Sequence, residues 1–169
     1  MIERVKEFPV LSDYLVYHNT YLENHFEVLI IPSRWKFEQL ESWAPNTLWT
    51  MANDKAKIIQ ESEGYKGRSD YAIKEGGGYY ASRLAVLEGL NRMRRQGAVV
   101  VIREAYEGYL MPVGVWEVRE NVRIALRKKS RRFSTLKEAV GDINSRLRIP
   151  VEEYIRRSVV LRQRRLDEF

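Results

Sequence analysis

Apolar residues recur every three or four positions between Tyr79 and Met93, which is the period of an amphipathic helix. A glycine run at residues 76–78 precedes this helix, and glycine tolerates a sharp turn because it has no Cβ. Gly97 follows the helix as a natural stop. Residues 98–102 then form an unbroken, largely β-branched run, which favours a strand buried on both faces. A helix that leads directly into a covered strand is one half of an α/β layer.

More strands are predicted in the first third of the chain. Residues 14–17 and 25–31 have the aromatic and β-branched composition of strands. Residues 35–43 alternate in their first half and fit either a strand or a short helix. Residues 57–61 favour a strand. The predicted sheet therefore draws strands from both sides of the central helix.

The last third of the chain is predicted to be helical and basic. Apolar spacing continues as a helix to Leu126, and the basic residues 127–132 are expected to close it. Ser134 or Thr135 fits the N-cap of a helix over residues 136–147. Pro150 opens a final helix, where its missing N–H is tolerated.

These elements predict an α+β (or α/β) fold, with a mixed sheet packed by a central helix and followed by a basic helical C-terminal arm. The expected division is a mixed α/β core at residues 1–126, the basic arm at residues 127–162 and a short tail at residues 163–169.

Composition narrows the possible chemistry. The 169 residues include no cysteine and two histidines, so disulfides and cysteine-based zinc sites are excluded and a structural metal site is not expected. The chain has no run of 18 or more apolar residues, and its first residues lack the pattern of a signal peptide. We expect a cytoplasmic, nucleoid-associated protein with no membrane partner and no cofactor.

Positive charge is concentrated towards the C-terminus. Residues 1–116 carry 14 Lys and Arg against 15 Asp and Glu, a balance of −1, whereas residues 117–169 carry 15 against 8, a balance of +7. A polyanion or an acidic protein surface is the natural partner of such a segment. A solvated helix face is the alternative.

The last seven residues carry the sharpest functional pattern. Gln163, Leu166 and Phe169 are spaced by three, which places them on one side of a short 3₁₀ turn. The two apolar side chains can then enter one pocket while the glutamine amide forms hydrogen bonds beside it. This peptide resembles a PIP box, through which repair and replication proteins dock on the PCNA sliding clamp. The alternative is that Leu166 and Phe169 fasten the helix end to the domain.

Longer motifs carry a family resemblance. The segments GGGYYASRLAVLEGL, RRQGAVVVIRE and PVGVWEVRENVR resemble the C-terminal half of the archaeal Nre DNA-repair proteins, and LIIPSRWKFEQLESWAP fits the upstream region of the same family. The resemblance implies a role in DNA repair and a C-terminal PIP-type motif, which Gln163, Leu166 and Phe169 match. Family members are usually much longer, and some carry an N-terminal zinc region with cysteines that this chain lacks.

Nucleic-acid contacts are predicted at two places. Tyr79, Tyr80 and Arg83 begin the central helix and could stack on a nucleic acid strand, or they could belong to the core. The glycine run before them either presents N–H groups to a phosphate or only makes a tight turn. The basic arm supplies the second set of predicted contacts: Arg127, Lys128, Lys129, Arg131, Arg132, Arg156 and Arg157.

A metal-dependent nuclease is the alternative function. Acidic residues cluster after the buried strand, where a nuclease would place its metal ligands: Glu104, Glu107, Glu117 and Glu120. Neighbouring arginines explain the same residues equally well as ion pairs. Mg²⁺ or Mn²⁺ is expected only under this alternative.

The favoured hypothesis is therefore a DNA-repair or genome-maintenance protein. It docks on PCNA through residues 163–169 and contacts DNA, its expected second partner, through the basic arm.

Overall fold

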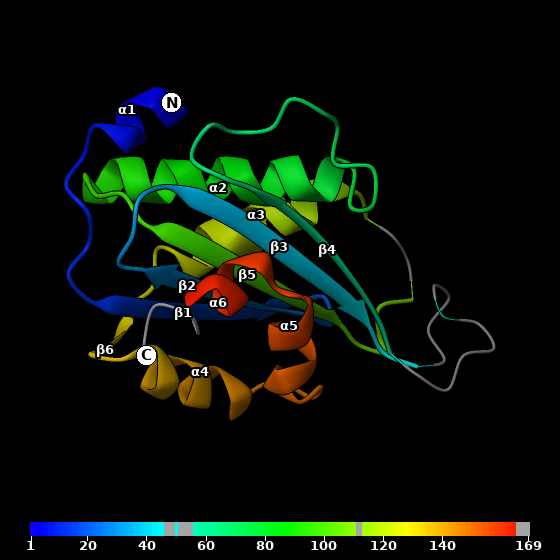
Figure 1. Ribbon diagram of the computed structural model, residues 1–169. Helices are drawn as coiled ribbons and strands as arrows, with labels where there is room; N and C mark the ends of the chain where they lie inside the picture. Colours follow the sequence, from blue (N-terminus) through cyan, green and yellow to red (C-terminus); the bar gives the residue numbers. More distant parts are fainter. Residues whose placement is uncertain (46–49, 51–55, 111–112, 165–169) are drawn as a thin grey trace.

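The computed structural model describes residues 1–45, 50, 56–110 and 113–164, with side chains described up to Arg162. Within these residues, a six-stranded mixed sheet lies between two layers of helices (Figure 1). The predicted α+β class with a mixed sheet is confirmed. The same residues contain no helix that is both long and apolar enough to cross a membrane.

The strand order is β4-β3-β5-β2-β1-β6. Strand β5 pairs in parallel with β3 and antiparallel with β2, so it joins the two halves of the sheet. All eight of its residues are buried, as the apolar run predicted. The strand bounds are β1 Tyr14–Tyr21, β2 Asn24–Ile31, β3 Lys36–Trp43, β4 Lys57–Glu63, β5 Ala98–Ala105 and β6 Arg131–Phe133.

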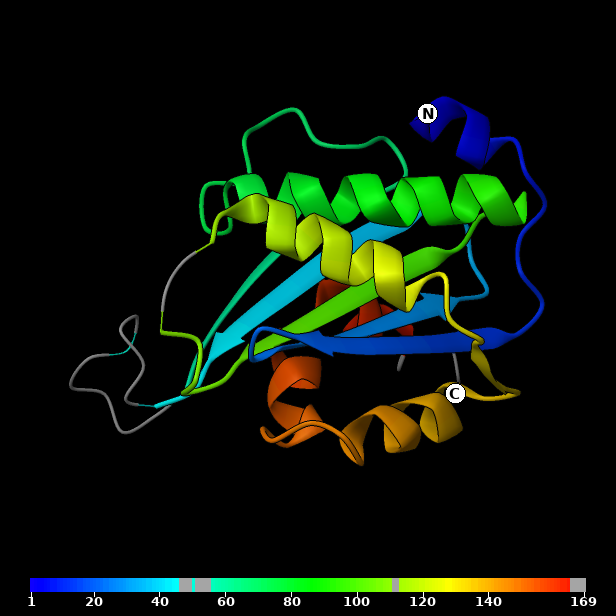
Figure 2. The same cartoon turned by 180° about the vertical axis from the view of Figure 1, so that it is seen from behind.

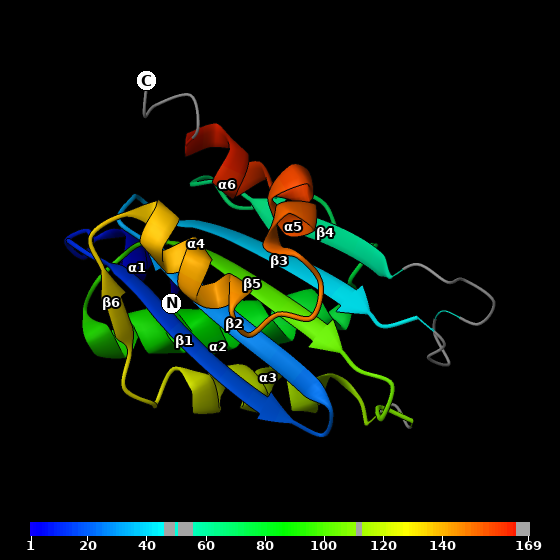
Figure 3. The ribbon, with the colours of Figure 1, turned by 90° about the horizontal axis from the view of Figure 1, so that it is seen from below.

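Helices cover both faces of the sheet (Figures 1 and 2). On one face lie α1 (Ile2–Lys6), α2 (Gly77–Met93) and α3 (Val115–Ala125). On the other lie α4 (Leu136–Asn144), α5 (Val151–Arg157) and α6 (Val159–Arg164), seen from below in Figure 3. We call these the first and second faces of the sheet.

Alternation along the strands divides the core between the two faces. Phe37, Val99 and Val101 pack under α2 and α3 on the first face. Leu40 and Val100 pack with the helices of the second face. Residues that are neighbours in sequence therefore contribute to different hydrophobic clusters.

Three predicted boundaries change. Residues 127–132 do not extend the helix, because α3 ends at Ala125 and Arg131–Phe133 pair with β1 as an edge strand. This basic stretch lacks the apolar spacing that would hold a helix on the sheet. The predicted final helix is divided at Ser158, whose ψ of 133° is extended, and α4 ends at Asn144.

Helix starts agree better with their sequence signals. Thr135 caps α4, where the N–H of Glu138 donates to its Oγ1 at 3.2 Å and the Glu138 carboxylate accepts from the N–H of Thr135 at 3.0 Å. Pro150 was expected to be the first residue of the last helix, but it is the N-cap of α5, which begins at Val151. Helix α2 begins at Gly77, two residues before Tyr79, where the apolar periodicity begins.

Candidate functional site

A pocket of about 180 Å³ lies where the carboxyl ends of the parallel strands β3 and β5 meet the first turns of α2 and α3. Ligands of open α/β sheets bind at this position, outside the carboxyl ends of the strands. The lining residues are Glu41, Trp43, Glu75, Gly78, Arg103, Tyr109, Gly114, Val115 and Val118. We refer to it as the strand-end pocket.

Arg103 supplies the positive charge of the strand-end pocket. Its Nε and Nη2 donate to Asn24 Oδ1 at 2.9 and 2.7 Å. Its Nη1 lies 3.4 Å from Glu41 Oε1, and its Nη2 lies 3.7 Å from Glu117 Oε2. The side chains of these two acids are 5% and 0% exposed. One oriented guanidinium therefore faces two buried carboxyl groups.

Burial raises the pKa of each acid at this end of the sheet. Arg103 opposes the rise at Glu41, and hydrogen bonding from Asn121 opposes it at Glu117. Glu75 has no such cation among the causes of its shift, so burial, followed by the charge of Glu41, raises its pKa to about 11. Glu75 is therefore a neutral carboxylic acid at pH 7.

Several buried oxygen atoms here have no hydrogen-bond partner within the described part of the chain. They include both carboxyl oxygens of Glu75 and the Oε1 of Gln39. The Nε2 of Gln39 donates to Glu41 Oε1 at 2.6 Å, so this amide belongs to the same polar group. Unpaired buried polar atoms are rare in folded proteins, and a ligand is one of the things that can satisfy them.

The glycine run shapes one wall of the pocket. Gly76 is the N-cap of α2 and has a φ of 56°, which a residue with a side chain rarely adopts. A Cβ on Gly78 would lie 2.9 Å from Glu41 Oε1. The run thus permits both a turn and a close approach of α2 to β3. Phosphate binding by its N–H groups stays a prediction.

The three residues predicted to stack on nucleic acid connect α2 to neighbouring segments. Tyr79 is fully buried, and its hydroxyl donates to Glu63 Oε2 at 3.3 Å. Arg83 donates to Glu63 Oε1 at 2.8 Å, and the Tyr80 hydroxyl accepts from the N–H of Ala72 at 3.0 Å. In this arrangement Tyr79 presents no ring face to a nucleic acid strand.

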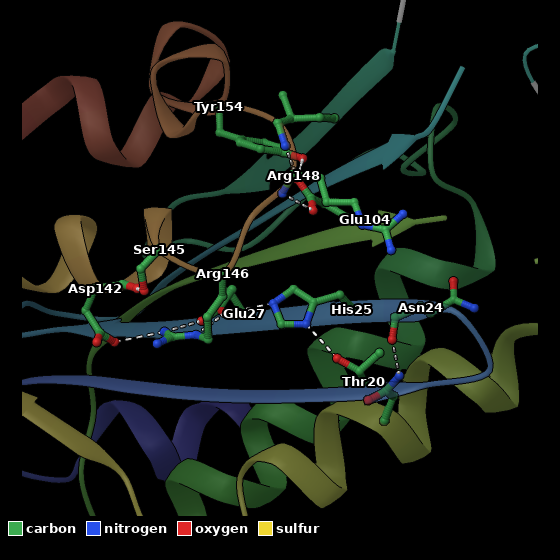
Figure 4. A network of polar contacts seen from close by, with 12 residues as sticks. Thr20, Asn24, His25, Glu27, Glu104, Asp142, Ser145, Arg146, Arg148 and Tyr154 are labelled. Carbon is green, nitrogen blue, oxygen red and sulfur yellow. Dashed lines mark hydrogen bonds and ion pairs between the residues drawn. The ribbon is translucent and has the colours of Figure 1, made fainter. Parts of the chain in front are cut away.

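On the second face, Glu104 is a buried acid whose acceptors are fully used. Its carboxylate accepts from the hydroxyl of Tyr154 at 2.8 Å and from the N–H of Arg148 at 2.9 Å (Figure 4). It also accepts from the hydroxyl of Tyr106 at 3.2 Å and from the N–H of Ile149 at 3.0 Å. Four donors match the capacity of one carboxylate. Glu104 therefore fastens the segment before α5 to the end of β5.

Glu27 performs the same task nearer the middle of the sheet. Arg146 donates to its two oxygens at 2.7 and 2.9 Å and to Asp142 at 2.8 Å (Figure 4). His25 lies 2.8 Å from Glu27 Oε1 through Nε2 and 2.7 Å from Thr20 Oγ1 through Nδ1. This network holds the end of α4 against β1 and β2.

The other three predicted nuclease ligands each pair with an arginine. Glu107 pairs with Arg148 at 2.9 Å, and Glu120 pairs with Arg119 and Arg123 on α3. Glu117 is a buried residue of α3 beside Arg103, on the opposite face of the sheet from Glu104. Across residues 1–45, 50, 56–110 and 113–164, no three acidic or histidine side chains are grouped so as to hold a metal ion.

The predicted clamp-binding tail begins within α6. Glu38 on β3 anchors this helix, because its carboxylate accepts from Ser158 Oγ and from the N–H groups of Val159 at 2.6 Å and Val160 at 3.2 Å. Gln163 lies in α6, although its side chain is not among those described. Leu166 and Phe169 lie outside the described residues.

The basic residues do not form one continuous arm. A first group lies at or beside β6, a second lies on α5, and α4 separates them (Figures 1 and 3). Some already pair with acids: Arg131 with Asp142, Arg132 with Asp13, and Arg156 and Arg157 with Glu153. Lys128 donates to Asn19, and Arg127 and Lys129 are both exposed to solvent.

Two family models match the chain. The model described as "Archaeal Nre, N-terminal" matches residues 1–50, and the model described as "Archaeal Nre, C-terminal" matches residues 63–169. The chain belongs to the archaeal Nre family. The N-terminal match includes residues 29–45, which the sequence motifs had related to the upstream region of the family.

Curated Nre relatives agree with this assignment. The chain is 38% identical to "DNA repair protein NreB" of Archaeoglobus fulgidus and covers 44% of its length. It is 34% identical to "DNA repair protein NreA" of Haloferax volcanii and covers 40% of it. The matches span 100% and 98% of this chain. The chain thus spans about two fifths of the length of these relatives. No solved structure matches.

The two Nre regions form one sheet. Residues 1–50 supply β1, β2 and β3, and residues 63–169 supply β5 and β6. Because β5 lies between β3 and β2, the C-terminal region completes the hydrogen bonding of the N-terminal one. The strand-end pocket uses both, with Glu41 from the first region and Arg103 from the second.

Sequence reasoning missed most of this pocket. Of the charged residues in and beside the pocket, only Glu117 was predicted as a site residue. Glu41, Glu75 and Arg103 were not predicted. The available signal was weak but present: Glu41 continues the alternation of β3, and Glu75 stands directly before the glycine run. Both are charged residues at positions that face the core.

Proposed function

We propose that this chain takes part in DNA repair and docks on the PCNA sliding clamp through residues 163–169. The observation that carries the proposal is the spacing of Gln163, Leu166 and Phe169, which fits a PIP-type peptide. The repair role is supported by the names of the two Nre relatives, each of which is called a DNA repair protein.

The position of α6 supports a tether. Val160 and Leu161 are buried in the second-face core, and Glu38 binds the first turn of the helix. The peptide therefore starts from a fixed point on the domain. A short peptide that leaves a rigid support raises the effective concentration of the domain at the clamp.

DNA contact is the second part of the proposal. The exposed basic residues beside β6, among them Arg127 and Lys129, are available for phosphate groups. Phosphate contacts release counterions, so clamp-free DNA binding should weaken steeply as salt rises. Docking through apolar side chains should respond much less to salt.

The nuclease alternative remains a separate prediction. The hydrogen bonds of Glu104 argue against a role as a metal ligand, because a carboxylate that accepts four hydrogen bonds has little capacity left for a metal ion. Incubation with labelled single- and double-stranded DNA and Mg²⁺ or Mn²⁺ tests it directly. Cleavage that Glu104→Gln abolishes in a folded protein would put the nuclease first.

Calorimetry of the intact chain against an archaeal PCNA clamp tests docking. The double variant Leu166→Ala, Phe169→Ala should lose binding, since each apolar anchor of such an interface contributes about 2 kcal/mol or more. The matched control is Asp167→Ala, Glu168→Ala, which changes the same number of residues but leaves the spaced pattern intact. Failure of the unaltered chain to bind the clamp would overturn the proposal.

A further inference from the structure

The strand-end pocket lies on the first face of the sheet, whereas α6, in which the predicted clamp-binding segment begins, packs on the second face. We propose that the strand-end pocket binds a single unpaired nucleobase, the part of a nucleic acid that DNA repair would present to it. This inference rests on the proposed repair role but not on the clamp.

Size limits the ligand to something compact. A volume of about 180 Å³ is smaller than the range of roughly 300–1,000 Å³ typical of pockets for drug-sized ligands. One planar ring system fits such a volume better than a whole nucleotide with its sugar and phosphate. A base that has left the helical stack is a ligand of this kind.

The polar wall offers the hydrogen bonds that a base edge needs. A neutral carboxylic acid presents a donor and an acceptor side by side, and both oxygens of Glu75 lack a partner among the described residues. Nucleobase edges also present donors and acceptors next to each other. Glu75 can therefore form a paired set of hydrogen bonds with a base that enters the pocket.

The remaining walls offer stacking surfaces and a fixed charge. Trp43 and Tyr109 line the pocket, and flipped bases are commonly held between aromatic or apolar side chains. Arg103 is oriented by Asn24 through two hydrogen bonds, so it does not need to reorganise when a ligand enters. The pocket thus combines aromatic surface, a donor–acceptor pair and a cation.

Exposed apolar side chains surround the entrance. Val115, which lines the pocket, is 51% exposed, and the adjacent Trp116 is 43% exposed. Tyr71 is 58% exposed, and its hydroxyl lies 3.6 Å from the position of a Cβ on Gly76 at the start of α2. Aromatic side chains at such positions can stack on the bases that flank an unpaired one.

The test uses a DNA duplex with one bulged 2-aminopurine, whose fluorescence increases when the base leaves the stack. The intact chain, without clamp, should change this emission in a saturable manner and should affect the fully paired duplex much less. Val115→Trp fills the entrance and should weaken binding roughly tenfold, the order expected for one lost base stack. Ile124→Trp, at an exposed position of the same helix, is the matched control and should bind normally.

A pair of substitutions at Glu75 tests the chemistry. Glu75→Gln keeps a donor and an acceptor side by side and should retain the emission change, whereas Glu75→Leu should lose it. Equal behaviour of these two variants, or of the two tryptophan variants, would overturn the proposal, as would an unchanged emission with the intact chain. The Leu166→Ala, Phe169→Ala variant should still bind the bulge, so failure of clamp docking and failure of the pocket are read separately.

Discussion

Acidic residues are buried on both faces of this sheet, but they differ in whether their carboxyl oxygens have hydrogen-bond partners. On the second face, Glu104 and Glu38 accept hydrogen bonds from α5, α6 and the segment before them. On the first face, Glu75 has two carboxyl oxygens without partners among the described residues, beside a pocket. The first pair hold elements together, whereas the unsatisfied acid lines a pocket.

The difference shows why burial alone does not identify a site. A buried carboxylate with a full set of donors is explained by the fold, because each donor would lose its partner if the acid were removed. A buried acid without partners has a cost that the fold does not offset. Substitutions in the two groups should therefore change stability in opposite directions.

The largest loss of stability is expected at Glu104. Glu104→Gln replaces an acceptor oxygen with an amide donor that faces existing donors, so it should lower the free energy of unfolding by about 2–4 kcal/mol. Urea unfolding measures this. Glu107→Gln is the control: it removes one exposed ion pair and should change stability by less than about 0.5 kcal/mol. Equal losses of unfolding free energy in Glu104→Gln and Glu107→Gln would contradict the structural role of Glu104.

A smaller loss is expected at the anchor of α6. Glu38→Gln weakens the acceptor that binds the first turn of this helix, which should cost about 1–2 kcal/mol, as does loss of an N-cap. Amide hydrogen exchange should accelerate in α6 before it does in β3. In Glu138→Gln the capping box of α4 is kept, so its stability should be nearly unchanged. An equal acceleration of amide exchange in α6 and in β3 of the Glu38→Gln variant would contradict a local role of Glu38 at α6.

An effect of opposite sign, a gain in stability that grows with pH, is expected at Glu75. Its pKa is about 11 in the folded chain against an ordinary value of 4.5. Above pH 4.5 the unfolded chain loses a proton that the folded chain retains, so Glu75 makes the protein less stable as pH rises towards 11. Glu75→Gln removes this penalty.

The melting temperatures of Glu75→Gln and the unaltered chain should be similar near pH 4. At pH 8, which is 3.5 units above the ordinary pKa of 4.5, the penalty at about 1.4 kcal/mol per unit is about 5 kcal/mol. The variant should therefore melt roughly 10–20 °C higher, because about 1 kcal/mol corresponds to roughly 2–4 °C in a domain of this size. Glu152→Gln, on the exposed side of α5, should show no such pH dependence. A lower melting temperature for Glu75→Gln at pH 8 would mean that its carboxylate is stabilised by the fold.

Much of the local structure could be predicted. The three- and four-residue spacing before Met93 predicted α2, the apolar run predicted the buried β5, and Thr135 was one of the two residues predicted as the cap of α4. Residues 127–132 were assigned wrongly to a helix. Their edge strand depends on pairing with β1, which lies more than a hundred residues earlier in the chain.

The sequence by itself determined the elements, the charge gradient, the family and the spacing of Gln163, Leu166 and Phe169, because these depend on residues that are close together in the chain. Only the tertiary structure decided which acids are satisfied. Glu41 and Glu104 each stand beside an apolar strand residue and look alike in the sequence. The pleat of the sheet turns Glu104 towards Tyr154 and turns Glu41 towards Arg103 and the strand-end pocket.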